Sequence, residues 1–336
     1  MAKYLLGVDG GNSKTDYMLC REDGTFIDIM RRPSCSHEHM PTGYAGAQDV
    51  MQSHLNDLFA KNNIKVTDIA SAAFGLAGAD MPLQVDALSS CIRHLGFTKF
   101  TVANDGILGV KAVAESGVCA INGAGTVVVG IDLNGNVLQV GGIGPLSGDH
   151  AGGYHIARNG IAAVYSHLTR MGEYTAIIPE IMNIYSINNA ADLHNLIGSN
   201  IRLSETATEI VRIIDNAALK GDRVASKILD KVGICCAEGV CGCIRNLSFE
   251  REVLVVKAGS IWHKLQYPGL VKNFTDTVRQ NTALATKFVM LDSPPVLGAI
   301  FWAKEQLHGP IDTKYRNEML NFFKAEKYDE LVRGGH

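Results

Sequence analysis

The stretch Gly7-Val8-Asp9-Gly10-Gly11-Asn12-Ser13-Lys14-Thr15 lies between two apolar segments that predict strands. Glycines at a hairpin bend allow backbone N–H groups to approach an anion closely, because no Cβ stands in the way. Ser13, Lys14 and Thr15 add hydroxyl and ammonium donors, and Asp9 can hold a hydrated Mg²⁺ that neutralises phosphate charge. A single Gly-Gly hairpin is more often a plain turn than a nucleotide site, so this stretch needs further support.

A related pattern recurs later in the chain. An apolar segment over 118–122 is followed by Gly123-Ala124-Gly125-Thr126 and by a second apolar segment over 127–131. Each copy continues through a tight turn into a third strand, expected over 25–29 and 136–140. This repetition predicts a duplicated domain, and two such turns facing each other across a cleft would hold a triphosphate.

The remaining pattern indicates an α/β protein with helices packed on mixed sheets. Helices are expected over 43–61, 81–95, 151–168, 204–220, 222–247 and 269–280, and further strands over 68–75, 99–104, 253–257 and 287–291. We expect an N-terminal domain over 1–117 and a larger C-terminal domain with extra helices over 118–336.

Size and composition are typical of a soluble two-domain protein. The chain has 336 residues, of which 46% are hydrophobic and 19% charged, and its formal net charge is −3. This charge gives no attraction for nucleic acid or anionic lipid, and no apolar run reaches the roughly 18 residues that a membrane span needs. We expect a cytoplasmic protein that binds neither nucleic acid nor membrane. A homodimer is compatible with the sequence, which does not determine the oligomeric state.

The eight cysteines suit a reducing compartment. Cys235, Cys236, Cys241 and Cys243 form one cluster, for which a metal or iron–sulfur site competes with buried positions on a helix. Apolar residues recur around them at helical spacing, which favours burial. His150 and His155 lack a third ligand at suitable spacing, so we expect no metal there.

Asp105 follows the strand expected over 99–104, where a helix begins. Open α/β folds bind ligands at this edge of the sheet. Asp105 is therefore a candidate general base that takes a proton from an attacking hydroxyl, or a helix N-cap, or both.

Two further segments are rich in glycine. The loop over 141–153 contains Asp149, which could bind sugar hydroxyls or Mg²⁺ or could cap the next helix. The apolar strand near residue 255 breaks at Gly259-Ser260, where a flat adenine ring could rest on the backbone; the simpler interpretation is a strand-to-helix turn.

Together these segments resemble the BadF/BadG/BcrA/BcrD ATPase family, and within it the N-acetylglucosamine kinase-like sugar kinases. That family belongs to the actin/Hsp70/hexokinase superfamily, so the resemblance implies two duplicated ribonuclease H-like domains with a cleft between them. It also implies ATP and Mg²⁺ as cofactors and Asp105 as the catalytic base.

The resemblance assigns nucleotide binding to three groups of positions: Gly10, Gly11, Asn12, Ser13, Lys14 and Thr15; Gly123, Ala124, Gly125 and Thr126; and Ala217, Gly259 and Ser260. It places Asn216, Gly221 and Asp222 near the same nucleotide. It assigns sugar binding to Ser36, His37, Gly78, Asn104, Asp105, Val127, Gly142, Ile143, Gly144 and Asp149.

The chain departs from the animal N-acetylglucosamine kinases within this set. Those enzymes carry Asn at the position of Ser36, Trp at that of Ile143 and Asn at that of Val127. They also have Thr in place of Ala124 and Glu in place of His150. Because a site built to hydrogen-bond a substrate group discriminates against analogues that lack it, we expect an amino- or N-acyl-hexose rather than N-acetylglucosamine in particular.

Two other functions are compatible with the phosphate turns. One is an ATP-driven activator of a dehydratase or reductase, which holds a [4Fe–4S] cluster between subunits by cysteines; here Cys119 is expected within a strand and the later cluster on a helix. The other is an actin- or chaperone-like ATPase, for which no added peptide-binding or filament module is evident. We therefore predict a sugar kinase with a small-molecule sugar as its partner.

Overall fold

The computed structural model describes residues 3–199, 201–323, 328 and 332. The chain divides into two compact units: the first comprises residues 1–119, 129–137 and 291–336, and the second comprises 120–128 and 138–290. The boundary that the sequence suggests between residues 117 and 118 stays a prediction. Among the helices that the structure describes, none has the length and apolar content to cross a membrane.

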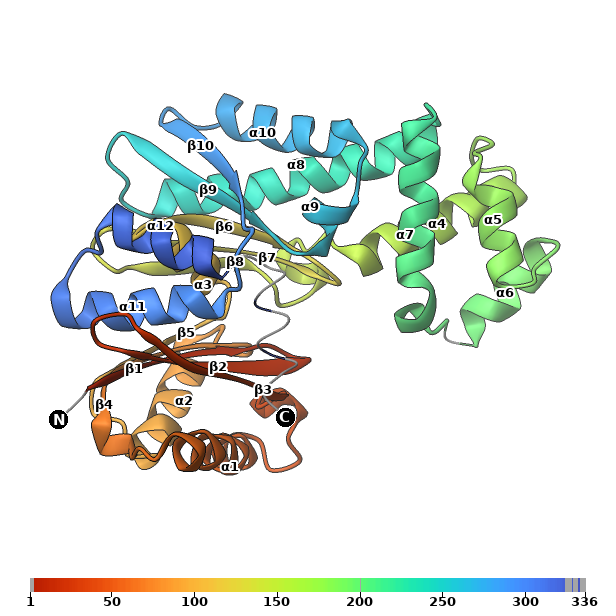
Figure 1. Cartoon of the computed structure of the whole chain (residues 1–336). Helices are drawn as coiled ribbons and strands as arrows, with labels where there is room; N and C mark the ends of the chain where they lie inside the picture. Colours follow the sequence, from red (N-terminus) through yellow and green to blue (C-terminus); the bar gives the residue numbers. More distant parts are fainter. Residues whose placement is uncertain (1–2, 200, 324–327, 329–331, 333–336) are drawn as a thin grey trace. The chain divides into compact units, whose positions relative to one another are not determined.

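The first unit contains a five-stranded sheet in the order β3-β2-β1-β4-β5 (Figure 1). Its strands are β1 (Tyr4–Gly10), β2 (Lys14–Arg21), β3 (Phe26–Pro33), β4 (Ile69–Leu76) and β5 (Phe100–Ala103). β1 pairs antiparallel with β2 and parallel with β4, and β4 pairs parallel with β5. The expected hairpin at residues 10–15 is thereby confirmed, with Gly10 opposite Thr15.

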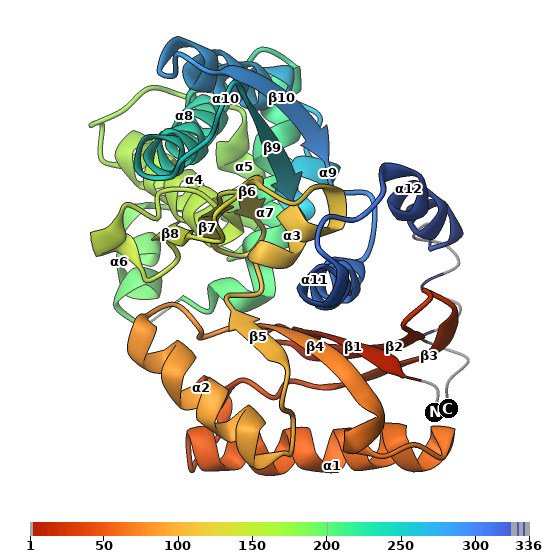
Figure 2. The same ribbon diagram turned by 90° about the vertical axis from the view of Figure 1, so that its left-hand side faces the viewer.

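Helices cover both faces of this sheet (Figure 2). The helices of the first unit are α1 (Tyr44–Asn62), α2 (Pro82–His94), α3 (Ile107–Val113), α11 (Val296–His308) and α12 (Thr313–Phe322). α1 and α2 pack on one face around Tyr17 and Phe74, and α11 and α12 pack on the other around Met18 and Phe301. Burial of apolar side chains on both faces stabilises this layered arrangement.

Helix α11, which was not predicted from the sequence, lies closely against β1 and α3. A Cβ added at Gly7 of β1 would lie 2.9 Å from the backbone nitrogen of Ile300, and one added at Gly298 would collide with the carbonyl oxygen of Leu108. The helix is apolar on most sides because it is buried among neighbours, so its sequence lacks the one-sided periodicity that identifies a surface helix.

The second sheet has the order β10-β9-β6-β7-β8. Its strands are β6 (Gly117–Asn122), β7 (Thr126–Ile131), β8 (Val137–Gly141), β9 (Glu252–Ala258) and β10 (Ala285–Met290). Read from the opposite edge, the order 8-7-6-9-10 reproduces the order 3-2-1-4-5 of the first sheet. The duplicated α/β fold that the sequence predicts is therefore confirmed.

The second unit carries α4 (Gly153–Leu168), α5 (Ile177–Ile184), α6 (Ala190–Gly198), α7 (Leu203–Leu219), α8 (Arg223–Asn246), α9 (Ser260–Lys264) and α10 (Pro268–Gln280). α8 packs along α10, and α4 packs on α7. Within this unit, α5 and α6 lie far from β9 and β10 (Figure 1). α5, α6 and α9 are additions to the elements expected from the sequence.

Candidate functional site

The hairpin between β1 and β2 is held from two sides. The N–H of Gly11 donates to the carbonyl of Lys14 at 3.0 Å, and the hydroxyl of Ser34 donates to the carbonyl of Gly11 at 2.8 Å. Among the described residues, no acceptor pairs with the N–H groups of Asn12 and Ser13. Two adjacent unpaired N–H groups in a fixed turn can bind an anion.

Lys14 and Thr15 lie differently at the end of this hairpin. The ammonium of Lys14 is half exposed and lies 3.4 Å from the carboxylate of Asp16. Thr15 is buried, and its hydroxyl donates to the Cys35 thiol at 3.3 Å and accepts from the Cys35 N–H at 3.1 Å. Because it is half exposed, the Lys14 ammonium can contact an anion as well as Asp16, whereas Thr15 connects the hairpin to the loop after β3.

Two half-buried carboxylates, Asp9 on β1 and Asp105 after β5, belong to the same unit as this hairpin. Burial, with a contribution from Asp105 and then from Asp16, raises the pKa of Asp9 to about 8. Burial and the carboxylate of Asp80 raise the pKa of Asp105 to about 6. A Cβ added at Gly11 would lie 3.8 Å from an Asp105 carboxylate oxygen, so Asp105 lies beside the hairpin. Such raised pKa values are characteristic of functional sites.

The interpretation of Asp105 as a helix cap is wrong. α3 begins at Ile107 with Gly106 as its N-cap, and no side chain accepts a capping hydrogen bond there. The N–H of Gly106 instead donates to the side chain of Asn104 at 2.8 Å, and the Asn104 amide donates to Asp80 at 2.6 Å. Asn104 therefore holds the backbone next to Asp105, and the Asp105 carboxylate is left available for chemistry.

Three further positions predicted to bind sugar lie in the first unit: Ser36, His37 and Gly78. A Cβ added at Gly78 would lie 2.5 Å from the His37 ring, so the two positions are in contact. The ring of His37 stacks on Tyr44, with ring centroids 4.2 Å apart. The Ser36 hydroxyl and the Nδ1 atom of His37 are buried, and neither has a hydrogen-bond partner among the described residues. Because unsatisfied buried polar atoms are costly, such atoms point to a ligand or water.

The turn between β6 and β7 in the second unit is clamped by the start of α4. The N–H groups of Gly153 and Tyr154 donate to the carbonyls of Gly123 and Ala124 at 2.8 and 3.0 Å. In the part of the chain that the structure describes, the N–H groups of Ala124 and Gly125 have no acceptor. This turn therefore repeats the feature of the first hairpin, with two unpaired donors in a fixed backbone. Thr126, the first residue of β7, donates its hydroxyl to the carbonyl of Ile121 at 3.1 Å.

Gly259 brings the end of β9 against the end of β6. Its φ of 101° and ψ of 162° fall in a region that essentially only glycine adopts. A Cβ there would lie 2.5 Å from the carbonyl oxygen of Asn122, so no other residue fits without displacement of the backbone. Ser260 then begins α9, and the strand break expected at Gly259-Ser260 is confirmed.

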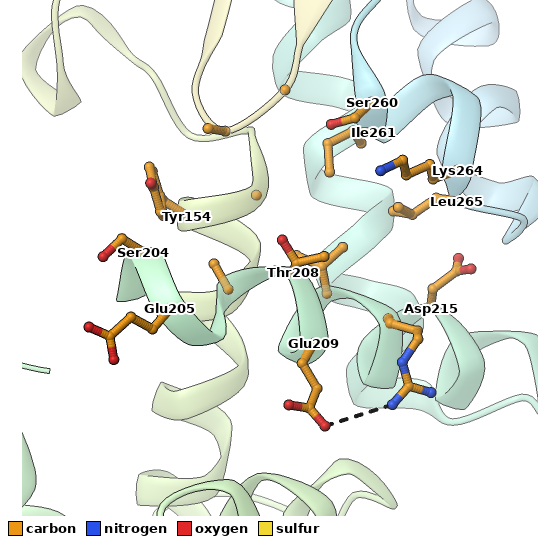
Figure 3. Close-up of a pocket in the computed structure, with 16 residues that line it drawn as sticks. Tyr154, Ser204, Glu205, Thr208, Glu209, Asp215, Ser260, Ile261, Lys264 and Leu265 are labelled. Atoms are coloured by element: carbon orange, nitrogen blue, oxygen red, sulfur yellow. Dashed lines mark ion pairs between the residues drawn. The ribbon is translucent and has the colours of Figure 1, made fainter. Parts of the chain in front are cut away.

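A pocket of about 710 Å³ lies next to this junction in the second unit (Figure 3). It is lined by Gly123, Ala124, Gly153, Tyr154, Ser204, Glu205, Ala207, Thr208, Glu209, Val211, Arg212, Asp215, Ser260, Ile261, Lys264 and Leu265. Ser260 and Lys264 lie on one side of the pocket, across from Thr208 of α7 (Figure 3). Of the positions predicted to bind nucleotide, Gly123, Ala124 and Ser260 line this pocket, and Gly259 immediately precedes Ser260.

Helices α7 and α9 contribute one wall of the pocket, which was not predicted from the sequence. Ser204, Thr208 and Arg212 recur every four residues on α7, and Lys264 follows Ser260 by four residues on α9. The spacing of four residues between these polar side chains, together with the strand break at Gly259-Ser260, could have indicated these helix faces in the sequence. Among these side chains Arg212 forms only a loose pair with Glu209, at 3.9 Å and largely exposed, so its charge remains accessible.

Other positions expected near the nucleotide do not line the pocket. Ala217 is buried within α7, two residues after Asp215, the last residue of this helix that lines the pocket. Asp222 caps α8 by accepting the N–H of Ala225 and also accepts the Thr175 hydroxyl, both at 2.9 Å. By contrast Asp215, which was not predicted, lines the pocket and accepts the N–H groups of Gln266 and Tyr267 at about 3.0 Å, thereby fixing the link between α9 and α10.

The glycine loop after β8 is organised by Asp149. Its carboxylate accepts the N–H of Gly142 at 2.8 Å, the N–H of Gly144 at 2.6 Å and the hydroxyl of Ser147 at 3.1 Å. The expectation that Asp149 could cap the following helix is wrong, since Gly152 is the N-cap of α4. The loop approaches Val127, because a Cβ at Gly142 would lie 2.7 Å from that side chain. Ile143 at the tip of the loop is 67% exposed, which leaves an apolar side chain available to a ligand.

The four clustered cysteines all lie on α8, as expected. Cys236, Cys241 and Cys243 are buried, and Cys235 is half-buried with its thiol donating to the carbonyl of Gly148 at 3.3 Å. In the described part of the chain, no group of three or more His, Cys, Asp or Glu side chains is arranged to hold a metal ion.

Comparison with known proteins connects these features to a family. The chain is 24% identical over 90% of its length to N-acetylmuramic acid/N-acetylglucosamine kinase of Clostridium acetobutylicum, 99% of which is covered. It is 22% identical over 77% of its length to N-acetyl-D-glucosamine kinase of Dictyostelium discoideum, 86% of which is covered. The crystal structure of a proposed N-acetylglucosamine kinase from Chromobacterium violaceum matches 89% of this chain and 98% of its own with a TM-score of 0.64 at 19% identity, which is a likeness of fold.

The model of the BadF/BadG/BcrA/BcrD ATPase family matches residues 6–303, which include both turns, Asp105, the glycine loop and the Gly259-Ser260 break. On this match, the chain belongs to the BadF/BadG/BcrA/BcrD ATPase family.

Proposed function

We propose that the protein is an ATP-dependent kinase that phosphorylates a hydroxyl of an amino- or N-acetyl-hexose, such as N-acetylglucosamine or glucosamine. The observation that carries this proposal is the position of Asp105. Its carboxylate does not cap a helix, has a raised pKa, and lies beside a turn with unpaired N–H groups. A base near an anion-binding turn suits transfer of a phosphoryl group to a hydroxyl.

In the proposed reaction, Asp105 accepts the proton of the sugar hydroxyl as its oxygen attacks the γ-phosphorus of ATP. The bond between this phosphorus and the oxygen that bridges to the β-phosphate breaks, and ADP leaves with that electron pair. Asp105 then releases its proton to solvent. In the first unit, the N–H groups of Asn12 and Ser13 would bind phosphate oxygens, and Lys14 would add a positive charge. In the second unit, the N–H groups of Ala124 and Gly125 offer donors of the same kind.

The pocket of about 710 Å³ is our candidate for the nucleoside. Its volume falls within the range of small-molecule sites, about 300–1,000 Å³. Ser260 and Lys264 supply polar groups, and Ile261 and Leu265 supply apolar surface for a flat base. For the sugar, the unpartnered Ser36 hydroxyl and His37 nitrogen offer hydrogen bonds in the first unit.

The donor set near Asp9 fits Mg²⁺. Mg²⁺ is commonly bound by one or two carboxylates together with waters and substrate phosphates, so a cage of protein ligands is not required. When bound, the ion would neutralise phosphate charge. Burial and then the nearby carboxylates raise the pKa of Asp9, and such a cation would favour its ionised form.

A screen of hexoses, aminohexoses and N-acylhexosamines by coupled ADP assay tests the proposed function. We expect ADP release with Mg-ATP to depend on an amino- or N-acetyl-hexose. Turnover without sugar that a protein stimulates would contradict the proposal and favour an actin- or chaperone-like ATPase. An iron–sulfur chromophore in anaerobically purified protein would favour the activator type instead.

Replacing Asp9 with Asn should stabilise the metal-free protein at high pH. The pKa of Asp9 is raised from 3.8 to about 8, so its contribution to stability is fully present below about pH 4 and is lost as the pH rises towards 8. The full shift of about four pKa units corresponds to about 6 kcal/mol, and the partial exposure of Asp9 reduces this value. In EDTA at pH 8, Asp9→Asn should therefore be more stable than the wild type by about 2 kcal/mol or more. Thermal unfolding at pH 5 and pH 8 measures this difference.

The control for this experiment is Asp49→Asn, which removes an exposed carboxylate from α1. It should leave the pH dependence of unfolding unchanged. The Asp9→Asn variant should also lose sugar-dependent ADP release, since its proposed role is to hold Mg²⁺. Equal pH dependence in the wild type and Asp9→Asn would refute the electrostatic argument.

A further inference from the structure

A second, smaller pocket of about 230 Å³ lies in the second unit between the glycine loop and α8. Its lining comprises Thr126, Val127, Val128, Val140, Gly141, Ser147, Gly148, Asp149, Cys235, Cys236, Glu238 and Gly239. The volume is several times the liquid volume of one water, about 30 Å³, so a sugar substituent fits inside. Val127 and Asp149 are also among the positions to which the resemblance described in Sequence analysis assigns sugar binding.

The charge in this pocket has one sign. Asp149 and Glu238 are carboxylates, and the lining contains no Lys, Arg or His. Asp149 is compensated by the hydrogen bonds that it accepts from the loop. Glu238 is exposed, and among the described residues no cation lies within ion-pair distance of it. Glu238 therefore contributes an uncompensated negative charge at the pocket.

The negative charge of this pocket should affect which hexosamine the protein accepts as substrate. N-acetylmuramic acid is N-acetylglucosamine with a lactyl ether whose carboxylate is ionised at neutral pH, and one relative is described as a kinase of both sugars. N-acetylglucosamine is neutral, and glucosamine carries an ammonium group. The three sugars thus differ in charge on a common ring.

Building on the proposed sugar kinase function, we propose that the pocket beside α8 receives a substituent of the sugar and that Glu238 selects against an anionic one. A carboxylate placed there would be repelled by Glu238, and the residues that line the pocket include no Lys, Arg or His to offset this repulsion. A neutral N-acetyl group meets no such repulsion, and an ammonium group is attracted. Glu238 is a specificity residue in this proposal, and Asp105 remains the base.

The first test compares N-acetylmuramic acid with its neutral methyl ester, which is larger but uncharged. We expect kcat/KM to be higher for the ester than for the acid. The ratio of kcat/KM for glucosamine to that for N-acetylglucosamine should be larger at low salt than at high salt, because salt screens the attraction of the ammonium group to Glu238. Equal kcat/KM for the acid and the ester would overturn the proposal, because size rather than charge would then decide.

The second test replaces Glu238 with Gln. The ratio of kcat/KM for N-acetylmuramic acid to that for N-acetylglucosamine should rise on the order of three- to tenfold, as expected for removal of one partly screened charge. Glu180→Gln is the matched control, since Glu180 is an exposed helical glutamate on α5 outside the pocket lining. It should leave the ratio unchanged. An equal ratio in the wild type and Glu238→Gln would overturn the role of Glu238.

A third measurement locates the sugar independently of turnover. Of the eight cysteines, seven are buried and Cys235 alone is half-buried, and it lines this pocket. Burial raises the pKa of its thiol, and Glu238 and Asp149 add to this effect. Because only the thiolate reacts with iodoacetamide, alkylation is measured at pH 8.5 to increase the thiolate fraction. N-acetylglucosamine should slow alkylation of Cys235, whereas ATP alone should not.

The outcomes separate this inference from the proposed function. Sugar-dependent ADP release without protection of Cys235 would leave the kinase proposal intact and place the sugar elsewhere. If no hexosamine is turned over and none protects Cys235, both the kinase proposal and this inference fail. Protection together with a changed ratio in Glu238→Gln supports both.

Discussion

Replacing Asp105 with Asn should reduce sugar-dependent ADP release by about 10²- to 10⁴-fold, the usual contribution of a general base. The amide has nearly the same shape as the carboxylate but cannot take up the proton. Asp105 does not cap α3, and its neighbour Asn104 holds the adjacent backbone, so the local structure should survive the change. ATP affinity, measured by calorimetry, should stay within a factor of a few, because the base acts on the sugar hydroxyl.

Asp86→Asn provides the control, as it removes an exposed carboxylate from α2 in the same unit. The pH profile gives a second readout. Because the pKa of Asp105 is raised to about 6, kcat/KM of the wild type should fall about tenfold per pH unit below 6 and level off above it. Near-normal sugar-dependent turnover by Asp105→Asn would refute the role of Asp105 as the general base.

Replacing Gly259 with Ala should destabilise the protein by about 2–4 kcal/mol and weaken ATP binding. The backbone of Gly259 strongly disfavours any side chain, and this strain alone costs about 1–3 kcal/mol. The added methyl group would also lie 2.5 Å from the carbonyl oxygen of Asn122, which is rigid backbone at the end of β6. Relief of that contact must move Ser260 or the β6–β7 turn, and both belong to the candidate nucleotide site. Urea unfolding and calorimetry of ATP binding measure the two effects.

Gly135→Ala is a matched control because it introduces backbone strain at a positive φ without a steric clash between the new Cβ and neighbouring atoms. Gly135 also has a positive φ, 83°, but a Cβ there meets nothing within 4 Å. It should cost only about 1 kcal/mol and leave ATP binding unchanged. If Gly259→Ala is as stable as Gly135→Ala and binds ATP equally well, the close approach to Asn122 has no functional importance.

Some features of the site could be read from local sequence and others could not. The hairpins at residues 10–15 and 123–126 are encoded by glycines between apolar strands, so both were predictable and both form. The organising role of Asp149 could not be predicted, because a carboxylate before a helix has the same local pattern whether it caps the helix or binds a loop. The wall formed by α7 and α9 depends on packing between segments far apart in sequence.

The sequence by itself determined the duplicated α/β architecture and the places where the backbone turns. Strand periodicity and glycine conformation are local properties, and they occur twice in the same order along the chain. Only the tertiary structure decided the position of α11 against β1, the raised pKa values of Asp9 and Asp105, and the residues that line the two pockets. Burial and the proximity of charges arise from long-range packing, which no local pattern specifies.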